Sequence, residues 1–191
     1  MEVYFMILLF LTSLISTSAA VDTITANQSI KDGETIVSHG EMYELGFSAL
    51  ESPKNATWEY VSEEGNMLIS SGGNTVIWST GLTISATNNN PVVQLLDNGN
   101  LVMWYKNSTN TKLIWQSFDY PGDTMLPGMK IGKDLVTGLQ RTLTSWKSPD
   151  DPSPGIYRNI VDTNGYPQLF KWQVVVALNS VVLMEAVAST L

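Results

Sequence analysis

Apolar and polar side chains alternate on either side of a tight turn in residues 92–105. The run VVQLL (92–96) precedes the turn residues Asn98-Gly99, and the run LVMWY (101–105) follows them. Asn-Gly between two alternating runs is the strongest short-range signal of a β-hairpin, because glycine accepts the positive φ that such a turn requires. The pattern therefore predicts two antiparallel strands joined at Asn98-Gly99.

The same plan occurs once earlier in the chain. Asn66, in the word GNML, corresponds to Asn100, in the word GNLV, 34 residues later. The VIW that follows at 76–78 corresponds to LIW at 113–115. A strand–turn–strand unit that recurs at a fixed period predicts an all-β domain built from repeated hairpins. The six tryptophans lie in such alternating runs, so we expect them to fill the core rather than to form a sugar-stacking surface.

Weaker patterns lie outside the repeated units. Thr35–Val37 and Tyr43–Phe47 alternate as two strands, and Leu139–Trp146 alternates as one more. Between Phe118 and Pro154 the chain is otherwise rich in glycine and proline, which predicts turns. The turn-rich run at 149–155 predicts a domain boundary.

The last 19 residues, 173–191, break the pattern of the rest of the chain. VVLMEAVA (181–188) has a helix-like pattern after a series of strands, and such a conflict between local signals is unusual in a domain selected to fold. We interpret this tail as the product of a shifted reading frame or an altered splice rather than as a functional segment. A membrane helix is disfavoured, because Asn179, Ser180 and Glu185 would lie in a span of minimal length.

The first 20 residues predict a secretory signal peptide. Val3–Ile15 is an apolar core, and Ser18-Ala19-Ala20 provides small residues for signal peptidase, so the mature chain would begin at Val21. An uncleaved anchor is the alternative, but the apolar run is short for a membrane span. Export is supported by three N-glycosylation sequons, which begin at Asn27, Asn55 and Asn107.

Composition narrows the classes of function. The formal net charge of −8, without any basic run, argues against nucleic acid or an anionic membrane as a partner. The chain has no cysteine and one histidine, His39 in a Ser-His-Gly turn, which excludes a Cys/His metal site and disfavours Ser-His-Asp catalysis. The acidic pairs Glu63-Glu64 and Asp150-Asp151 are neighbours in turns, whereas a glycosidase places its carboxylates across a cleft. We therefore predict that the chain is not an enzyme and uses no cofactor.

Words along nearly the whole chain resemble one family of plant extracellular domains. They are DTITANQSIKDGETIVS (22–38), YELGF (43–47), PVVQLLDNGNLV (91–102), IWQSFDYPGDTMLPGMKIGKDLVTGLQRTLTSWKSPDDPSPGIY (114–157) and NGYPQLF (164–170). In this order they resemble the bulb-type, mannose-binding lectin domain, and more closely the extracellular part of S-locus glycoproteins and G-type lectin S-receptor-like serine/threonine kinases.

The chain also departs from the family. A tryptophan-rich hairpin normally follows YELGF and is absent here after about residue 48, and Gly122 replaces the cysteine of the family's DYPCDT. The resemblance implies an all-β fold, a β-prism (bulb-lectin type) of three small antiparallel sheets, incomplete by one pair of strands. The predicted organisation is a signal peptide (1–20), a lectin-like domain (21–148), the start of a truncated S-locus glycoprotein-like domain (149–172) and an aberrant apolar tail (173–191).

By resemblance, a carbohydrate site would follow the pattern Gln-x-Asp-x-Asn-x-Val-x-Tyr, in which polar side chains bind sugar hydroxyls and the valine packs on apolar carbons. On the second repeat this pattern falls on Leu96, Asn98, Asn100, Val102 and Trp104, of which only Asn100 and Val102 match. Gln94 lies on the same face, two residues out of register. The candidate carbohydrate-binding residues of this degenerate motif are Asn98, Asn100, Val102 and Trp104.

The resemblance implies a non-catalytic recognition domain of a plant S-receptor-like protein, secreted or at the cell surface. Its partners would be a mannose-type glycan or a protein or peptide ligand, many bulb lectins form homodimers, and some S-locus members act in pollen recognition. Two alternatives stay open. The chain is a fragment of a membrane receptor-like serine/threonine kinase whose kinase lies beyond Leu191, or it is a non-folding remnant without function.

Overall fold

The computed structural model describes residues 21–26, 28–31, 33–46, 56–60, 66–71, 75–82, 90–106, 112–163, 165–177 and 180–188. In this part the chain consists of β-strands and one short 3-10 helix, which confirms the all-β prediction. The predicted signal peptide and the sequon residues Asn27, Asn55 and Asn107 lie outside it. None of the described residues belongs to a helix that is long and apolar enough to cross a membrane.

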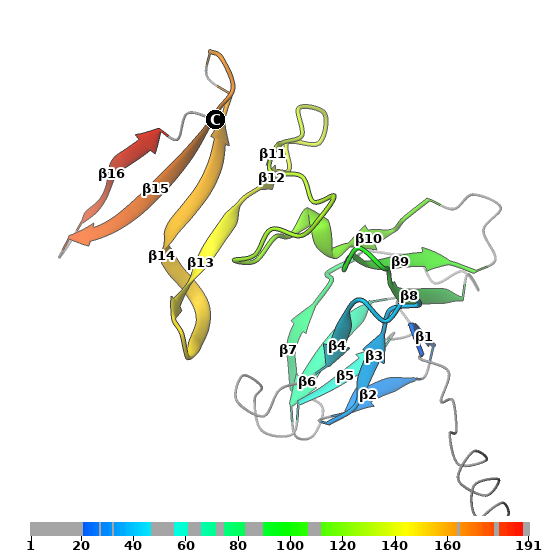
Figure 1. Cartoon of the computed structure of the whole chain (residues 1–191). Coiled ribbons are helices and arrows are strands. Elements are labelled where there is room, and N and C mark those ends of the chain that lie inside the picture. The colour runs from blue at the N-terminus through cyan, green and yellow to red at the C-terminus, as the bar shows by residue number, and fades with distance from the viewer. Residues whose placement is uncertain are drawn as a thin grey trace, which may run out of the picture.

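The N-terminal part of the chain forms three antiparallel sheets (Figure 1). The first sheet, in the order β1-β8-β9-β10, contains β1 (Thr23–Thr25), β8 (Pro91–Leu95), β9 (Leu101–Tyr105) and β10 (Trp115–Gln116). The second, in the order β2-β5-β6-β7, contains β2 (Ser29–Lys31), β5 (Ala56–Tyr60), β6 (Met67–Ser71) and β7 (Thr75–Ser79). The third pairs β3 (Thr35–Val37) with β4 (Glu44–Gly46). The 3-10 helix η1 (Ser117–Asp119) follows β10.

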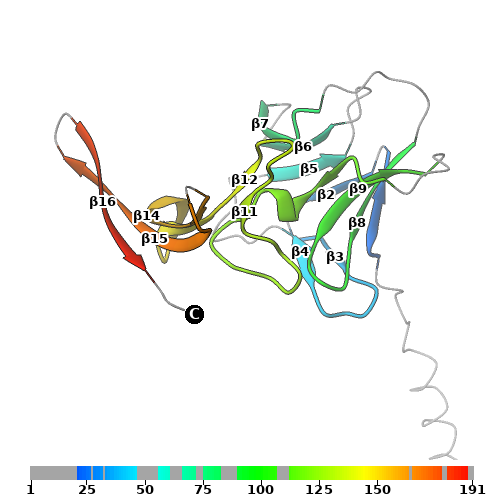
Figure 2. The same cartoon turned by 90° about the horizontal axis from the view of Figure 1, so that it is seen from above.

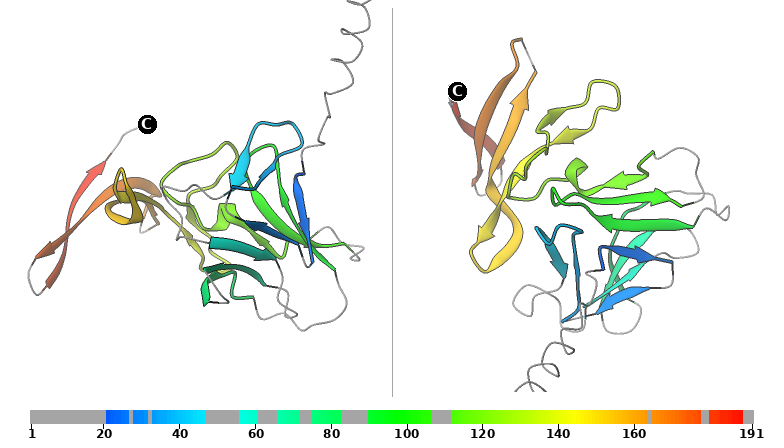
Figure 3. Two further views of the ribbon diagram at one scale, coloured as in Figure 1. Left: turned by 90° about the horizontal axis from the view of Figure 1, so that it is seen from below. Right: turned by 45° about the vertical axis from the view of Figure 1, so that its right-hand side comes forward.

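One apolar core lies between the three sheets. It contains Val93 and Met103 from the first sheet, Ile30 and Met67 from the second and Ile36 from the third, all buried in a single cluster. Side chains alternate between the two faces of a strand, so each period-two run supplies one face to this core. Burying each such side chain contributes about 2 kcal/mol. Three sheets around a shared core confirm the predicted β-prism (Figure 3).

Among the described residues, the third sheet has two strands where each of the others has four. The loss of a strand pair after residue 48 stays a prediction. A cavity of about 950 Å³ lies beside the third sheet, and core side chains such as Met67 and Trp115 line this cavity. The edge strand β7 forms another wall with Ile77 and Trp78, and Trp78 is 39% exposed. The core is therefore accessible on this side.

Most tryptophans do not fill the core, contrary to the prediction. Among the tryptophans whose side chains the structure describes, only Trp115 is buried, and Trp78 packs edge-on against it with ring centroids 6.0 Å apart. The others, Trp104, Trp146 and Trp172, are half-buried. The prediction was wrong because alternation shows that a side chain faces one side of a sheet, but not which side another element covers.

The turn between β8 and β9 is one residue longer than the predicted two-residue turn. Gly99 N donates to Leu96 O at 2.9 Å and Leu96 N donates to Asn100 O at 3.0 Å, which encloses the loop Asp97, Asn98 and Gly99. Gly99 has a φ of +82°. A three-residue hairpin loop commonly ends in such a left-handed residue. Gly99 therefore accepts a positive φ as predicted, but in a three-residue loop instead of a two-residue turn.

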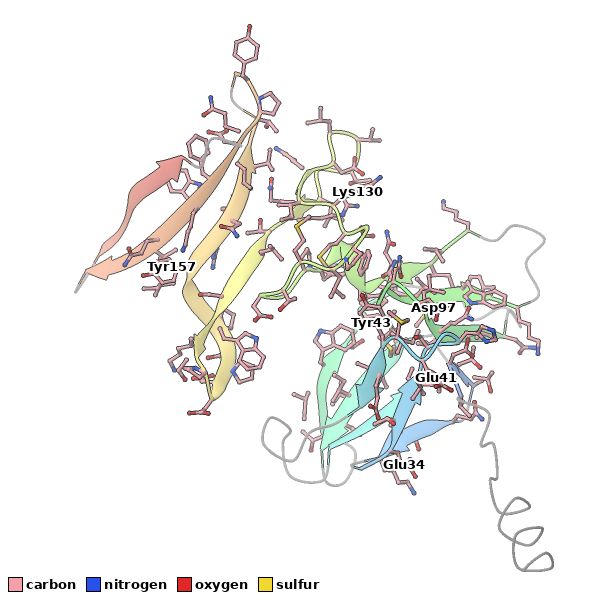
Figure 4. The ribbon with its side chains drawn as sticks, viewed as in Figure 1. Glu34, Glu41, Tyr43, Asp97, Lys130 and Tyr157 are labelled. Carbon is pink, nitrogen blue, oxygen red and sulfur yellow. The ribbon has the colours of Figure 1, made fainter. Side chains whose placement is uncertain are left out.

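This turn contacts the turn between β3 and β4. Figure 4 labels Asp97 in the first of these turns and Tyr43 in the second. Gly40 N donates to Asp97 Oδ1 at 2.6 Å. Tyr43 and Leu126 lie so close to Gly99 that an added Cβ would be 2.8 Å from the tyrosine ring and 2.9 Å from a leucine methyl. The two turns therefore hold the first and third sheets together at one end of the prism.

The remaining residues form a hairpin and a fourth sheet. The hairpin pairs β11 (Gly132–Lys133) with β12 (Gln140–Arg141). The sheet has the order β13-β14-β15-β16 and contains β13 (Leu143–Ser148), β14 (Asp151–Asp162), β15 (Gln168–Ala177) and β16 (Ser180–Ala188). It lies to one side of the prism in Figures 1 and 2. Arg141 forms an ion pair with Asp119 of η1, and Thr144 N donates to Gly122 O at 2.8 Å, which attach this part to the prism.

Two strand predictions for this part need correction. The strand expected at 139–146 is two strands, β12 and β13, that pair with different partners. In the turn-rich run at 149–155 the turn is confined to Pro149 and Asp150, and β14 begins at Asp151. One sheet therefore spans the position at which the domain boundary was predicted, and the boundary itself stays a prediction.

The tail is also not helical where the structure describes it. Residues 180–188 form strand β16, which pairs with β15 over most of its length. Three of its nine residues are valine, and β-branched residues favour strands when a neighbouring strand supplies hydrogen-bond partners. The helix-like spacing of VVLMEAVA was outweighed by this pairing.

We expect Gly99→Ala to lower the free energy of unfolding by about 2 kcal/mol or more, because it adds both backbone strain and contact with Tyr43 and Leu126. Urea denaturation measures the change. Gly138→Ala is the matched control, since Gly138 has a φ of +76° but nothing within 4 Å of an added Cβ. Equal losses in the two variants would show that the contacts at Gly99 contribute nothing.

Candidate functional site

The outer face of the first sheet carries an apolar patch bordered by amides. In the strand register, Val102 of β9 lies opposite Gln94 of β8 on one side and Gln116 of β10 on the other. Trp104 lies opposite Val92 one pair further along. All five side chains alternate with those of the core and so share the outer face.

The two valines are buried although they face outward. Val102 is 2% exposed and Val92 is 5% exposed, while Trp104 beside them is half-buried. A pyranose ring presents apolar carbons on its faces and hydroxyls at its edge, so the accessible part of the Trp104 indole with amide groups nearby suits it chemically.

A carboxylate also lies at this border. Gln94 Nε2 donates to Asp22 Oδ2 at 3.0 Å, and Leu95 N donates to the backbone oxygen of Asp22 at 2.9 Å. Asp22 immediately precedes β1 and is 72 residues from Gln94 in the chain. The contact fixes the glutamine side chain and leaves Gln94 Oε1 and Asp22 Oδ1 without a hydrogen-bond partner among the described residues.

Asn100 lies at the turn end of the same face, and its side chain is bound by the protein itself. It is 5% exposed. Its Oδ1 accepts from Ser117 Oγ at 3.1 Å and from Phe118 N at 3.2 Å, and its Nδ2 donates to Gln116 Oε1 at 3.0 Å. Ser117 Oγ in turn accepts from Leu101 N at 2.9 Å. The arrangement ties the start of β9 to the chain that leaves β10.

The four candidate residues are therefore divided. Val102 and Trp104 lie together on the outer face beside Gln94. Asn98 lies in the turn, where its Oδ1 accepts from Asn100 N at 3.0 Å, so both asparagines bind their own chain. Carbohydrate binding by these four residues stays a prediction. Sequence reasoning missed Asp22, because nothing near it in the chain indicates its contact with Gln94.

The first repeat contains the same arrangement around Asn66, which is 7% exposed. Asn66 Oδ1 accepts from Thr80 Oγ1 at 3.0 Å and from Leu82 N at 2.6 Å, and its Nδ2 donates to Leu82 O at 2.9 Å. Thr80 Oγ1 accepts from Met67 N at 3.2 Å. We call this arrangement of a buried asparagine, a hydroxyl residue and a backbone N–H the asparagine brace. It accounts for the asparagines that recur 34 residues apart.

We expect Asn66→Ala and Asn100→Ala each to lower the free energy of unfolding by about 2–3 kcal/mol, because each removes several hydrogen bonds and leaves buried backbone groups unsatisfied. Thermal or urea denaturation measures this loss. Asn159→Ala on β14 is the control, since the Asn159 side chain forms no hydrogen bond with another described residue. A loss as large in this control would contradict the role of the brace.

The described residues among those considered for catalysis lie apart from this face. His39 is exposed in the turn between β3 and β4. The Asp151 carboxylate accepts hydrogen bonds from Ser153 and lies 3.0 Å from Lys147 Nζ, which lowers its pKa to about 2. It is therefore ionised at neutral pH and unsuited to donate a proton. Glu63-Glu64 lies outside the described residues. Within the described ranges, no group of three or more His, Asp or Glu side chains is placed to hold a metal ion.

Comparison with known families and curated proteins gives a consistent result. The family model for D-mannose binding lectin matches residues 49–147. The receptor-like serine/threonine-protein kinase SD1-8 of Arabidopsis thaliana is 37% identical over 185 residues, which covers 81% of this chain and 22% of the kinase. The S-locus-specific glycoprotein S6 of Brassica oleracea is 35% identical over 200 residues, which covers 88% of this chain and 45% of the glycoprotein. The chain thus spans less than half the length of either relative.

Among solved structures, a Japanese Marasmius oreades lectin matches 51% of this chain and 90% of its own chain at 19% identity, with a TM-score of 0.43. A monomeric monocot mannose-binding lectin from Gastrodia elata matches 50% of this chain and 94% of its own at 18% identity, with a TM-score of 0.38.

Proposed function

Since the chain belongs to the D-mannose binding lectin family, we propose that it is a non-catalytic extracellular recognition domain that contacts its ligand through the outer face of the first sheet. The observation that carries this proposal is the gathering of Gln94, Asp22, Val102 and Trp104 on that face from three different strands or their ends. The side chains are of the types that recognise a neutral sugar, although they do not follow one strand.

The proposed contact uses each group for a separate purpose. The half-buried Trp104 indole is the apolar side chain available to the carbons of a sugar ring, because Val102 and Val92 are buried and support the sheet from beneath. Gln94 Oε1 and Asp22 Oδ1 accept hydrogen bonds from hydroxyl groups, and the bond between the two side chains reduces the entropy lost on binding. Asn100 supports the site indirectly, because it holds Gln116 at the other border of Val102.

The ligand class that fits best is a mannose-type glycan, with a protein or peptide ligand as the alternative that the S-receptor-like relatives suggest. Fewer polar groups converge here than in the five-residue family pattern, so we expect weak binding to a single sugar. Self-association as a homodimer, pollen recognition and occupancy of the three sequons stay predictions.

Calorimetric titration with methyl α-D-mannoside and with a mannotriose tests the proposal. We expect binding by the unaltered chain and about tenfold weaker binding by Gln94→Leu, because the variant removes the amide that borders Val102. Gln168→Leu, on exposed β15, is the matched control and should bind like the unaltered chain. The proposal that this sheet recognises a glycan would be wrong if neither sugar binds, or if Gln94→Leu and Gln168→Leu weaken binding equally.

A second candidate is that the chain is the N-terminal part of a receptor-like serine/threonine kinase. It rests on the 37% identity to such a kinase from Arabidopsis thaliana, of which the chain spans 22%. Sequencing the transcript past the codon for Leu191 tests this candidate. Kinase-coding sequence in the same frame would support it, and a stop codon would contradict it.

A further inference from the structure

A second cavity lies between the β11–β12 hairpin and the fourth sheet. Its volume is about 460 Å³, within the range of small-molecule sites. Lys133 and Gln140 line it from the hairpin, and Arg158 and Trp172 line it from β14 and β15. Gly132 brings the hairpin close to β14, since an added Cβ would lie 3.8 Å from Val161. Seven of its nine lining residues lie beyond residue 147, outside the family match.

A guanidinium group and the face of an indole ring line this cavity together. Arg158 and Trp172 are directly opposite one another in the register of β14 and β15, so guanidinium and indole share one face of the sheet. Phe170 supports the indole from the next position on that face, with ring centroids 6.0 Å apart. Gln140 and Thr163 add an amide and a hydroxyl.

Neither Lys133 nor Arg158, the two cations of the cavity, forms an ion pair with another described residue. The ion pairs of the described residues are Arg141 with Asp119 and Lys147 with Asp151, so neither Lys133 nor Arg158 is paired. Asp134, beside Lys133, accepts from the backbone N–H groups of its own turn, which lowers its pKa. Asp162 is the one carboxylate among the lining residues, so two positive charges face one negative charge. The local charge is therefore positive.

The distribution of charge along the chain reinforces this. Residues 21–129 contain four Lys and Arg against twelve Asp and Glu, whereas residues 130–172 contain six against four. The acidic prism would repel an anion over distances of about 10 Å at moderate salt, while the C-terminal part attracts it. Two unpaired cations next to an aromatic ring in an otherwise acidic protein suit an anion that also has an apolar ring face.

We propose that this cavity binds a saccharide that carries a carboxylate, such as a uronate residue. The Arg158 guanidinium and the Lys133 ammonium bind the carboxylate, the Trp172 indole packs on the sugar ring, and Gln140 and Thr163 bind hydroxyls. The site is separate from the neutral-sugar face of the first sheet and does not depend on it. Together the two sites give one chain distinct contacts for neutral and acidic sugars.

Titration of the full chain with trigalacturonate tests the proposal, with its fully methyl-esterified form as the neutral probe. We expect Arg158→Gln and Lys133→Gln each to weaken binding about tenfold, because each removes a charge-assisted hydrogen bond. Lys171→Gln is the matched control. It removes the same charge from the neighbour of Trp172, but Lys171 lies on the opposite face of β15, with its Nζ 4.9 Å from the centre of the Tyr157 ring. Figure 4 labels Tyr157 on β14.

Three results would overturn the proposal. The first is binding of the methyl ester as tight as that of trigalacturonate. The second is equal weakening of trigalacturonate binding by Lys171→Gln and Arg158→Gln. The third is inhibition of trigalacturonate binding by millimolar inorganic phosphate as strong as inhibition by added uronate. The last result would indicate an anion site without sugar recognition. Gln94→Leu distinguishes this site from the face of the first sheet, since it should leave trigalacturonate binding unchanged. Thermal denaturation of each variant confirms that a loss of binding is not a loss of folding.

Discussion

Two buried asparagine side chains hold the prism together at the points where the chain leaves one sheet for the next. The Asn66 side chain ties the start of β6 to the residues after β7. The Asn100 side chain ties the start of β9 to the residues after β10. An amide buried without partners would cost several kcal/mol, so its surroundings must supply donors and acceptors in fixed places. A hydroxyl residue and a backbone N–H do so in both copies. The apolar core, the strand register and the outer face of the first sheet all depend on these ends staying closed.

Among the described residues the third sheet has two strands and no asparagine brace, and the core residues Met67 and Trp115 border a large cavity on that side. The edge strand β7 presents Val76, Ile77 and Trp78 at more than a third of their full exposure. Edge strands with exposed apolar side chains favour association with other chains. The hydrogen bond between Gly40 and Asp97 and the contact of Tyr43 with Gly99 help to hold the short sheet against the prism, together with the hydrogen bond from Val37 N to Val21 O.

The two proposed sites are binding surfaces of opposite character. The face of the first sheet is apolar with neutral and acidic groups at its border, whereas the cavity beside the fourth sheet is cationic and aromatic. The two differ because most carboxylates of the chain lie before residue 130, whereas six of its ten basic residues lie from residue 130 onward. Most side chains of each surface lie on paired strands, and Asp22 and Thr163 lie directly beside a strand, which limits the entropy lost on binding.

The sequence by itself determined the hairpins, the repeat and the class of fold. Period-two runs around Gly99 specify strands and a left-handed turn residue locally, and the words shared with S-locus proteins identify the family. Tertiary structure decided the rest. The Asp22–Gln94 bond joins residues 72 positions apart, the braces join Asn66 and Asn100 to later hydroxyl residues, and Arg158 meets Trp172 only through strand pairing. The tail became a strand because β15 offered it hydrogen-bond partners. Local periodicity shows which faces a segment has, but which face is covered, and by what, depends on contacts between distant parts of the chain.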